Sequence, residues 1–238
     1  MNSKTIKKPV ILGILFFLPV IFLLFLIPAD HNYEPLDVVN ENVTEFNQAS
    51  DDLKLTDQIT VLAFFGEDPM KHVIAASNLK ELIYDKFMGF KKFQVVVVLP
   101  NKAAEDQANL EAFKKEISRF ETLEYWKYLV VEPEEVETLF NSLLTKDDLL
   151  EDLSSENVYI IDKDVNQRGR LDDRTDKEIE KNEQPYPLYA YNCIEIKDLK
   201  DKMSEDVRIL FTEYRQKRKG TFNSSQRRAD DIKGDEKN

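Results

Sequence analysis

The stretch ITVLAFFGEDP, residues 59–69, decides the fold because it joins a buried strand to the start of a helix. Residues 59–65 are almost wholly apolar, which is typical of a strand that is buried on both faces of a parallel sheet. Asp68 is a good N-cap residue and Pro69 suits the first helical position, so we expect a helix that reaches about Phe87. A second apolar run, FQVVVVLP at residues 93–100, predicts the next parallel strand.

The rest of the chain continues this alternation of strands and helices and ends with a hairpin and a closing helix. Such an order predicts an α/β domain with a thioredoxin-like fold, in which helices cover both faces of a mixed central sheet. A flavodoxin-like doubly wound sheet is the alternative, but a hairpin before the last helix fits it less well. The further predicted elements are helices at residues 110–120, 136–144 and 198–218, a strand at 126–131, and hairpin strands at 158–162 and 167–171.

An apolar segment precedes this domain. VILGILFFLPVIFLLFLI, residues 10–27, carries no charge and as a helix would reach about 27 Å, close to the ~30 Å hydrocarbon core of a membrane. Lys4, Lys7 and Lys8 precede the segment and acidic residues follow it, so the N-terminus is expected in the cytoplasm and the domain outside, in the periplasm if the source is bacterial. A cleaved signal peptide is the alternative, but the apolar run is longer than usual and no clear Ala-x-Ala site follows it.

The expected organisation therefore has five parts. These are a cytoplasmic N-terminus at residues 1–9, a transmembrane anchor at 10–28, a polar stalk at 29–56, the thioredoxin-like domain at 57–219 and a disordered polar tail at 220–238.

Composition excludes several classes of function. The 33 Lys and Arg residues face 45 Asp and Glu, and the resulting net charge of −12 would repel nucleic acid. Neither a Gly-x-Gly-x-x-Gly turn nor a phosphate-binding Gly-Lys-Ser/Thr loop is present, so nucleotide binding by these routes is not expected. Cys193 is the single cysteine, so an intramolecular disulfide or a multi-cysteine metal site cannot form. We expect Cys193 to be a small buried hydrophobic residue.

Three features resemble the Sco/SenC family. They are VLAFFGEDP at residues 61–69, VYIIDKDVNQRGRLDD at residues 158–173, and the N-terminal anchor. The resemblance covers roughly residues 59–218. It implies a membrane-anchored protein with a thioredoxin fold that handles copper for cytochrome c oxidase assembly.

The metal ligands of that family are missing from this chain. The resemblance places Asp68 and His72 at the two cysteines of the family's Cys-x-x-x-Cys motif. The family's third copper ligand is a histidine shortly before the strand that residues 158–162 match, and residues 153–157 contain no histidine. An aspartate at a helix start keeps an anion beside the unpaired backbone N–H groups but has no thiol chemistry.

These replacements predict a non-enzymatic, redox-inactive relative without a cofactor. We expect it to bind a protein partner in the cell envelope, with a respiratory oxidase subunit among the candidate partners. The alternative is a copper chaperone in which Asp68 and His72, four residues apart on one helical face, hold the metal together with Met70. A third hypothesis is a peroxidase or reductase that uses Cys193 alone, although this thiol does not lie at a helix start, where its pKa would be lowered.

Overall fold

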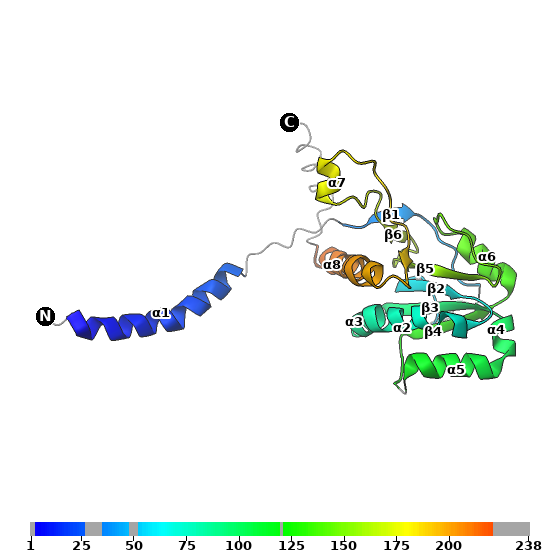
Figure 1. Cartoon of the computed structure of the whole chain (residues 1–238), viewed down its shortest axis with the longest axis horizontal. Coiled ribbons are helices and arrows are strands. Elements are labelled where there is room, and N and C mark those ends of the chain that lie inside the picture. Colours follow the sequence, from blue (N-terminus) through cyan, green and yellow to red (C-terminus); the bar gives the residue numbers. More distant parts are fainter. Residues whose placement is uncertain (1–2, 27–34, 48–51, 120, 221–238) are drawn as a thin grey trace. The chain divides into compact units, whose positions relative to one another are not determined.

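A computed structural model describes residues 3–26, 35–47, 52–119 and 121–220 of the chain (Figure 1). The chain divides into two units, residues 1–34 and residues 35–238. In the first unit, α1 (Ser3–Leu26) is a continuous helix, and its apolar side chains between Ile11 and Phe22 are exposed.

Among the residues described, no helix is both long enough and apolar enough to cross a membrane. The predicted anchor, residues 10–28, extends beyond the described residues and stays a prediction.

A mixed β-sheet forms the centre of the second unit (Figure 1). Its strands are β1 (Asp37–Asn40), β2 (Ile59–Phe65), β3 (Phe93–Pro100), β4 (Trp126–Val131), β5 (Ser154–Ile161), β6 (Gln167–Gly169) and β7 (Tyr191–Asn192). The order is β1-β6-β5-β2-β3-β4, and β7 also pairs with β5. β2, β3 and β4 are parallel, whereas β5 is antiparallel to β2 and β6 is antiparallel to β5. The antiparallel hairpin beside β2 agrees with the predicted thioredoxin-like arrangement and not with a doubly wound parallel sheet.

Helices cover both faces of this sheet. Phe64 and Phe65 are neighbours in β2 and point to opposite faces. Phe64 packs edge-on against Phe140 of α6, and Phe65 packs against Phe113 of α5. The helices are η1 (Pro69–His72), α2 (Val73–Leu79), η2 (Lys80–Tyr84), α3 (Asp85–Phe87), α4 (Lys102–Glu105), α5 (Gln107–Ser118), α6 (Pro133–Asn141), α7 (Asp176–Glu180), η3 (Asp198–Met203) and α8 (Ser204–Lys219).

The strands of the parallel part confirm the sequence prediction residue for residue. Every position of β2 and β3 is buried, as an unbroken apolar run requires when both faces of a sheet are covered. The predicted hairpin is also confirmed, although β5 begins at Ser154, four residues before the predicted strand. The predicted mixed α/β fold with a central sheet and helices is therefore confirmed.

The stalk predicted at residues 29–56 is largely part of the domain, so this prediction was wrong. β1 pairs with β6, and Val43, Phe46 and Leu55 are buried in the core that α6 covers. These apolar residues are few and irregularly spaced, so they leave no periodic signal in the sequence. Residues 29–34 and 48–51 lie outside the described residues.

Glu45 holds this segment in place. Its carboxylate accepts hydrogen bonds from the backbone N–H groups of Phe46, Leu55 and Thr56 at 2.7–3.0 Å and from the Thr56 hydroxyl at 2.8 Å. Burial raises the pKa of Glu45, but these hydrogen bonds outweigh it and hold the pKa below its ordinary value.

The polar insertion at residues 172–187 is ordered around a short helix. Thr175 and Glu178 form a capping box at the start of α7, in which each side chain binds the backbone N–H of the other residue. Of the tail predicted at residues 220–238, residues 221–238 lie outside the described residues.

A buried ionic cluster fixes α8 against the hairpin. The Arg168 guanidinium donates to Asp162 at 3.0 Å, to Glu213 of α8 at 2.6 Å and to the carbonyl oxygen of Leu36 at 2.7 Å. The three charged side chains are at most 4% exposed. Because charges in a dry site must be paired, this cluster specifies how α8, the hairpin and the start of the domain pack together.

Candidate functional site

The predicted site begins at the turn between β2 and η1, which is held tightly against the loop before β5. Gly66 has φ +64°, and a Cβ at this position would lie 2.6 Å from the carbonyl oxygen of Asp152. The backbone N–H of Glu67 donates to the same carbonyl oxygen at 2.9 Å. Only glycine combines this left-handed conformation with so close an approach, so the turn fixes where Asp68 begins.

Asp68 lies at the N-cap position of η1, but its side chain accepts no hydrogen bond from the helix. Its Oδ1 accepts from Nδ2 of Asn109 in α5 at 2.9 Å, and its Oδ2 lies 3.6 Å from Nζ of Lys71. The predicted capping role was therefore wrong. The segment begins as a 3₁₀ turn, in which the Asp68 carbonyl accepts from Lys71 N–H, and the carboxylate turns toward α5.

His72 faces the other side of the turn. Its side chain is 12% exposed, and its ring stacks on Phe65 with 5.8 Å between centroids and 8° between planes. Its Nε2 lies 3.9 Å from Oδ2 of Asp152, whose Oδ1 accepts hydrogen bonds from the N–H and hydroxyl of Ser154. Asp152 stands among several acidic residues that the sequence marks only as a solvated group, so no signal in the sequence separates it from the others.

The turn gives Asp68 and His72 different partners, and the donors present do not fit copper. In the described part of the chain, no group of three His, Cys, Asp or Glu side chains is placed to hold a metal ion. Cu(I) prefers thiolate or thioether ligands, and Met70, the soft donor nearby, lines an open groove. Copper binding at Asp68 and His72 therefore stays a hypothesis.

An open groove lies beside the turn, between the η1–α2 segment and α5. Near Met70 and Ala112 it has a volume of about 570 Å³. Ile74 is 65% exposed. The groove is lined by Met70, Val73, Ile74, Ser77, Asn78, Glu81, Ala112, Lys115, Glu116 and Arg119. The lining thus combines apolar and charged side chains, a combination suited to a polypeptide partner.

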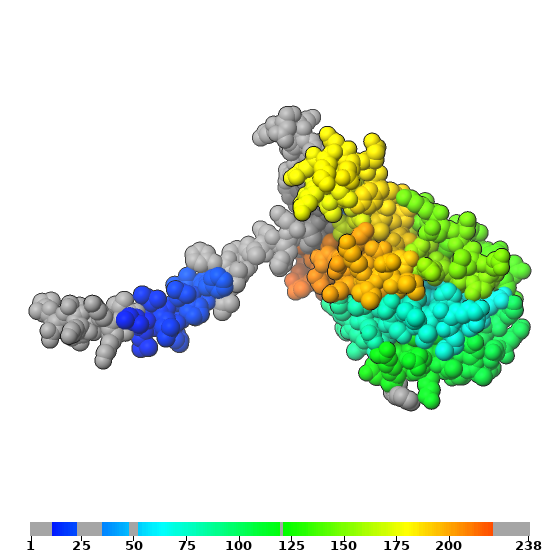
Figure 2. All heavy atoms as spheres, viewed as in Figure 1, coloured from blue at the N-terminus to red at the C-terminus, as the bar shows by residue number. Residues whose placement is uncertain are grey.

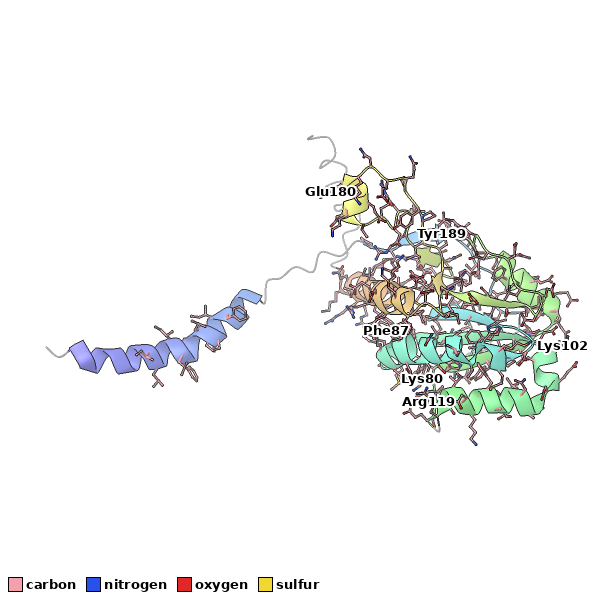
Figure 3. The ribbon with its side chains drawn as sticks, viewed as in Figure 1. Lys80, Phe87, Lys102, Arg119, Glu180 and Tyr189 are labelled. Carbon is pink, nitrogen blue, oxygen red and sulfur yellow. The ribbon has the colours of Figure 1, made fainter. Side chains whose placement is uncertain are left out.

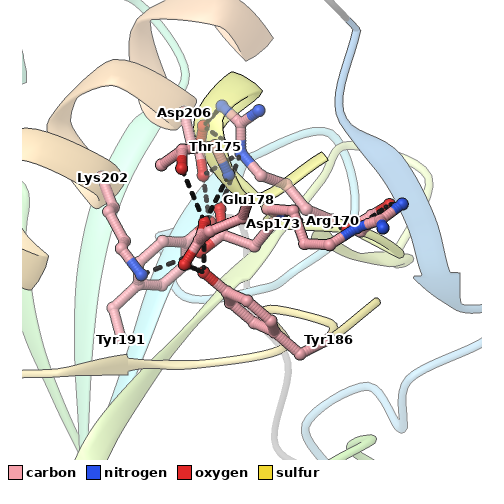
Figure 4. A network of polar contacts seen from close by, with 10 residues as sticks. Arg170, Asp173, Thr175, Glu178, Tyr186, Tyr191, Lys202 and Asp206 are labelled. Carbon is pink, nitrogen blue, oxygen red and sulfur yellow. Dashed lines mark hydrogen bonds and ion pairs between the residues drawn. The ribbon is translucent and has the colours of Figure 1, made fainter. Parts of the chain in front are cut away.

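A second polar network joins the insertion to α8 (Figure 4). The Arg170 guanidinium pairs with Asp206, which is fully buried, and the Tyr191 hydroxyl donates to Asp206 at 2.7 Å. Lys202 donates to Asp173 at 2.8 Å. Burial, together with the negative charge of Asp206, raises the pKa of Tyr191 well above its ordinary value, so the hydroxyl stays a proton donor. These groups satisfy one another, as expected of a structural network.

Cys193 is fully buried, as the sequence predicted. Its thiol donates to the carbonyl oxygen of Glu156 at 2.7 Å, and burial raises its pKa to about 12. A thiol in this state is not a nucleophile at neutral pH, so nothing at this position supports peroxidase or reductase chemistry.

No family model matches the sequence, and no curated protein matches it. Among solved structures, the chain is similar to a SCO1/SenC family lipoprotein from Bacillus anthracis, with 16% identity, a TM-score of 0.48, and coverage of 73% of this chain and 96% of that one. It is also similar to BsSco, a member of the Sco family of cytochrome c oxidase assembly proteins, with 14% identity, a TM-score of 0.45, and coverage of 77% and 99%. Arabidopsis thaliana ScoI with copper bound matches with 14% identity, a TM-score of 0.37, and coverage of 66% and 89%. The resemblance to the Sco/SenC family is thus found again among solved structures, at identities and TM-scores that carry no argument about the chemistry of this chain.

Proposed function

We propose that this protein is a membrane-tethered, redox-inactive binding protein, whose protein partner in the cell envelope docks in the groove between the η1–α2 segment and α5. The observation that carries the proposal is the contrast between the turn and the groove. The positions where the resembled family has thiols hold Asp68 and His72, which are engaged with neighbouring side chains, whereas the adjacent groove is open.

The groove has the anatomy of a binding surface. Ile74 offers a large exposed aliphatic side chain, and Met70 is flexible and polarizable, so it can adapt to the shape of a partner. At the rim, Arg119 pairs with Glu81 at 2.6 Å and Glu116 lies nearby. A central apolar contact with a charged rim is the arrangement from which affinity and specificity commonly arise.

The chemistry of the single thiol also supports a binding role. Cys193 is the only cysteine in the sequence, and it is buried with a raised pKa. Thiol-disulfide exchange that needs two cysteines of one chain is therefore not open to this protein. A predicted anchor at residues 10–28 would keep the domain at the outer face of the membrane, where envelope complexes assemble.

The test is complementation in cells that lack this protein. The sequence resemblance makes cytochrome c oxidase the first partner to examine, and the haem absorbance of the assembled oxidase in membranes is the readout. We expect Ile74→Glu to fail to restore the oxidase, because a carboxylate would have to be buried in the interface. Ile179→Glu, at a 48% exposed position in α7, is the matched control and should restore it.

Copper is tested separately, by anaerobic titration of the purified chain with Cu(I) and Cu(II) against a competing chelator. Stoichiometric binding that is lost in His72→Ala would replace the proposal with a copper carrier. Restoration of the oxidase by Ile74→Glu but not by His72→Ala would do the same.

A further inference from the structure

A basic and aromatic surface lies at the end of the sheet where β2 and β3 begin, away from the turn at Asp68. It is formed by the turn between α3 and β3 and by the exposed face of α8. Figure 3 labels Phe87, beside this turn, at one end of the domain and Lys102, which pairs with Glu67 next to the site, at the other end. The basic-aromatic surface comprises Lys86, Met88, Phe90, Lys91, Lys92, Arg208, Phe211 and Arg215.

The apolar members of this surface are half-exposed and firmly supported. Met88 is 48% exposed and Phe90 is 46% exposed. The ring of Phe90 lies 4.4 Å from that of Phe211 in α8, and Phe87 stacks on Phe211 at 5.8 Å. Figure 2 shows the side chains of α8, in orange, beside the cyan segment that precedes this turn. Phe90 and Met88 are therefore held outward by a packed aromatic cluster, and they form one apolar patch.

Cations surround this patch. Lys92 pairs with Asp57 at 2.6 Å, and Arg208 pairs with Glu205 at 2.9 Å. Lys91 and Arg215 are exposed and form no ion pair with any residue that the structure describes. Asp57 and Glu205 thus offset two of the five cations of this surface, and the remaining excess of positive charge contrasts with the net charge of −12 of the whole chain.

We propose that the basic-aromatic surface binds an anionic lipid surface, with Met88 and Phe90 entering the interfacial layer and the surrounding cations contacting lipid phosphates. Apolar side chains beside lysine and arginine are the composition of interfacial membrane-binding segments. Each Lys or Arg near an anionic surface strengthens such binding. Met88 and Phe90 do not line the groove, and the excess of cations beside them suits an anionic lipid surface. This inference rests on the membrane location proposed above.

The contact would orient the turn at Asp68. β2 and β3 start at the end of the sheet that carries the basic-aromatic surface and finish at the end that carries this turn. Binding of the first end to lipid therefore directs the turn away from the bilayer, and the groove then runs from the turn toward the bilayer.

The experiment uses the full chain with Met88→Trp in vesicles made from brominated lipids. Bromine quenches tryptophan fluorescence at short range, and the single native tryptophan, Trp126, is only 4% exposed and adds little background. We expect the tryptophan at position 88 to be quenched in vesicles that contain phosphatidylglycerol and not in vesicles of phosphatidylcholine alone. Adding Lys91→Gln and Arg215→Gln should abolish the quenching.

Lys177→Gln with Lys181→Gln is the matched control, because it removes the same charge from the α7 region and should leave the quenching intact. Absence of quenching with phosphatidylglycerol, equal quenching in both lipids, or indifference to Lys91→Gln and Arg215→Gln would each overturn the inference. Alkaline extraction of the vesicles tests the anchor independently. If the chain resists extraction but is not quenched, the proposed membrane location stands and the lipid contact is overturned. If the chain is extracted but is quenched, the lipid contact stands and the membrane anchor is overturned.

Discussion

The cluster around Arg168 and the turn at Asp68 and His72 both contain charged side chains, but they differ in how far these side chains are exposed and how closely they are paired. The Arg168 cluster is dry, with side chains at most 4% exposed and hydrogen bonds of 2.6–3.0 Å. At the turn, the Asp68 side chain is 36% exposed, and the ionic contacts of Asp68 and His72 are 3.6 and 3.9 Å long. A desolvated pair must be complete, whereas a solvated one can be altered at little cost. The Arg168 cluster therefore specifies the packing, whereas the partly exposed Asp68–Lys71 contact contributes little to it.

The largest expected effect is that of Arg168→Met, which leaves buried Asp162 without its cation and leaves Glu213 with Lys217 as its remaining cationic partner. We expect it to lower the free energy of unfolding by about 3–5 kcal/mol. Urea denaturation followed by Trp126 fluorescence measures the change. Arg208→Met is the control, because the Arg208–Glu205 pair is at least half exposed and its loss should cost about 0.5 kcal/mol or less. Equal losses in the two variants would show that burial does not separate the regions.

Gly66→Ala tests whether the backbone of the turn is rigid, although the Asp68 side chain is partly exposed. A Cβ would meet the carbonyl oxygen of Asp152 at 2.6 Å, and φ is +64°. We expect a loss of about 2–3 kcal/mol. Thermal unfolding measures this loss. Gly89→Ala, where a Cβ would have no neighbour within 4 Å, should be nearly neutral in the same measurement. A neutral Gly66→Ala would mean that the turn adapts as a whole.

The expected effect of Glu45→Gln lies between those of the two regions, because Glu45 is partly buried and its carboxylate binds mainly backbone N–H groups. Its folded pKa is lowered, so the stability it contributes is present above its unfolded pKa and is lost as the pH falls through the lower, folded value. We expect a loss of about 1 kcal/mol at pH 7, after allowing for partial exposure, and a smaller difference from the wild type near pH 3. Urea curves at the two pH values measure it, and a loss that is independent of pH would contradict the ionic role.

The smallest expected effect is that of Asp68→Asn. The carboxylate is partly exposed and its cationic partner Lys71 is 69% exposed, so we expect a change below about 0.5 kcal/mol. Differential scanning calorimetry beside the wild type measures the shift in melting temperature. A loss as large as that of Arg168→Met would mean that the turn, too, is a packing determinant.

The parts of the fold that could be predicted are those with short, largely apolar runs. β2, β3 and β4 have the bounds that their sequences indicate, because few alternatives exist for such segments. β1 could not be predicted, since its four residues pair with a strand more than a hundred positions away and only part of it is buried. Short strands depend on tertiary pairing, which local patterns do not contain.

The start of a helical turn after Asp68 was predicted, but the contacts of the Asp68 side chain were not. The sequence places Asp68 at a helix start, but it does not reveal that Asn109 from α5 reaches the carboxylate. The exposure of Ile74 agrees with its place in α2, because it lies five residues before buried Leu79, about 140° around the helix.

The burial of Cys193 has a practical consequence for dynamics. The thiol lies directly after β7 and binds the Glu156 carbonyl, so it becomes reactive only when this edge of the sheet separates from β5. No other thiol competes for a reagent. The rate at which the native protein is alkylated therefore counts the opening events of one sheet edge, and the free energy of that local opening can be read without unfolding the domain.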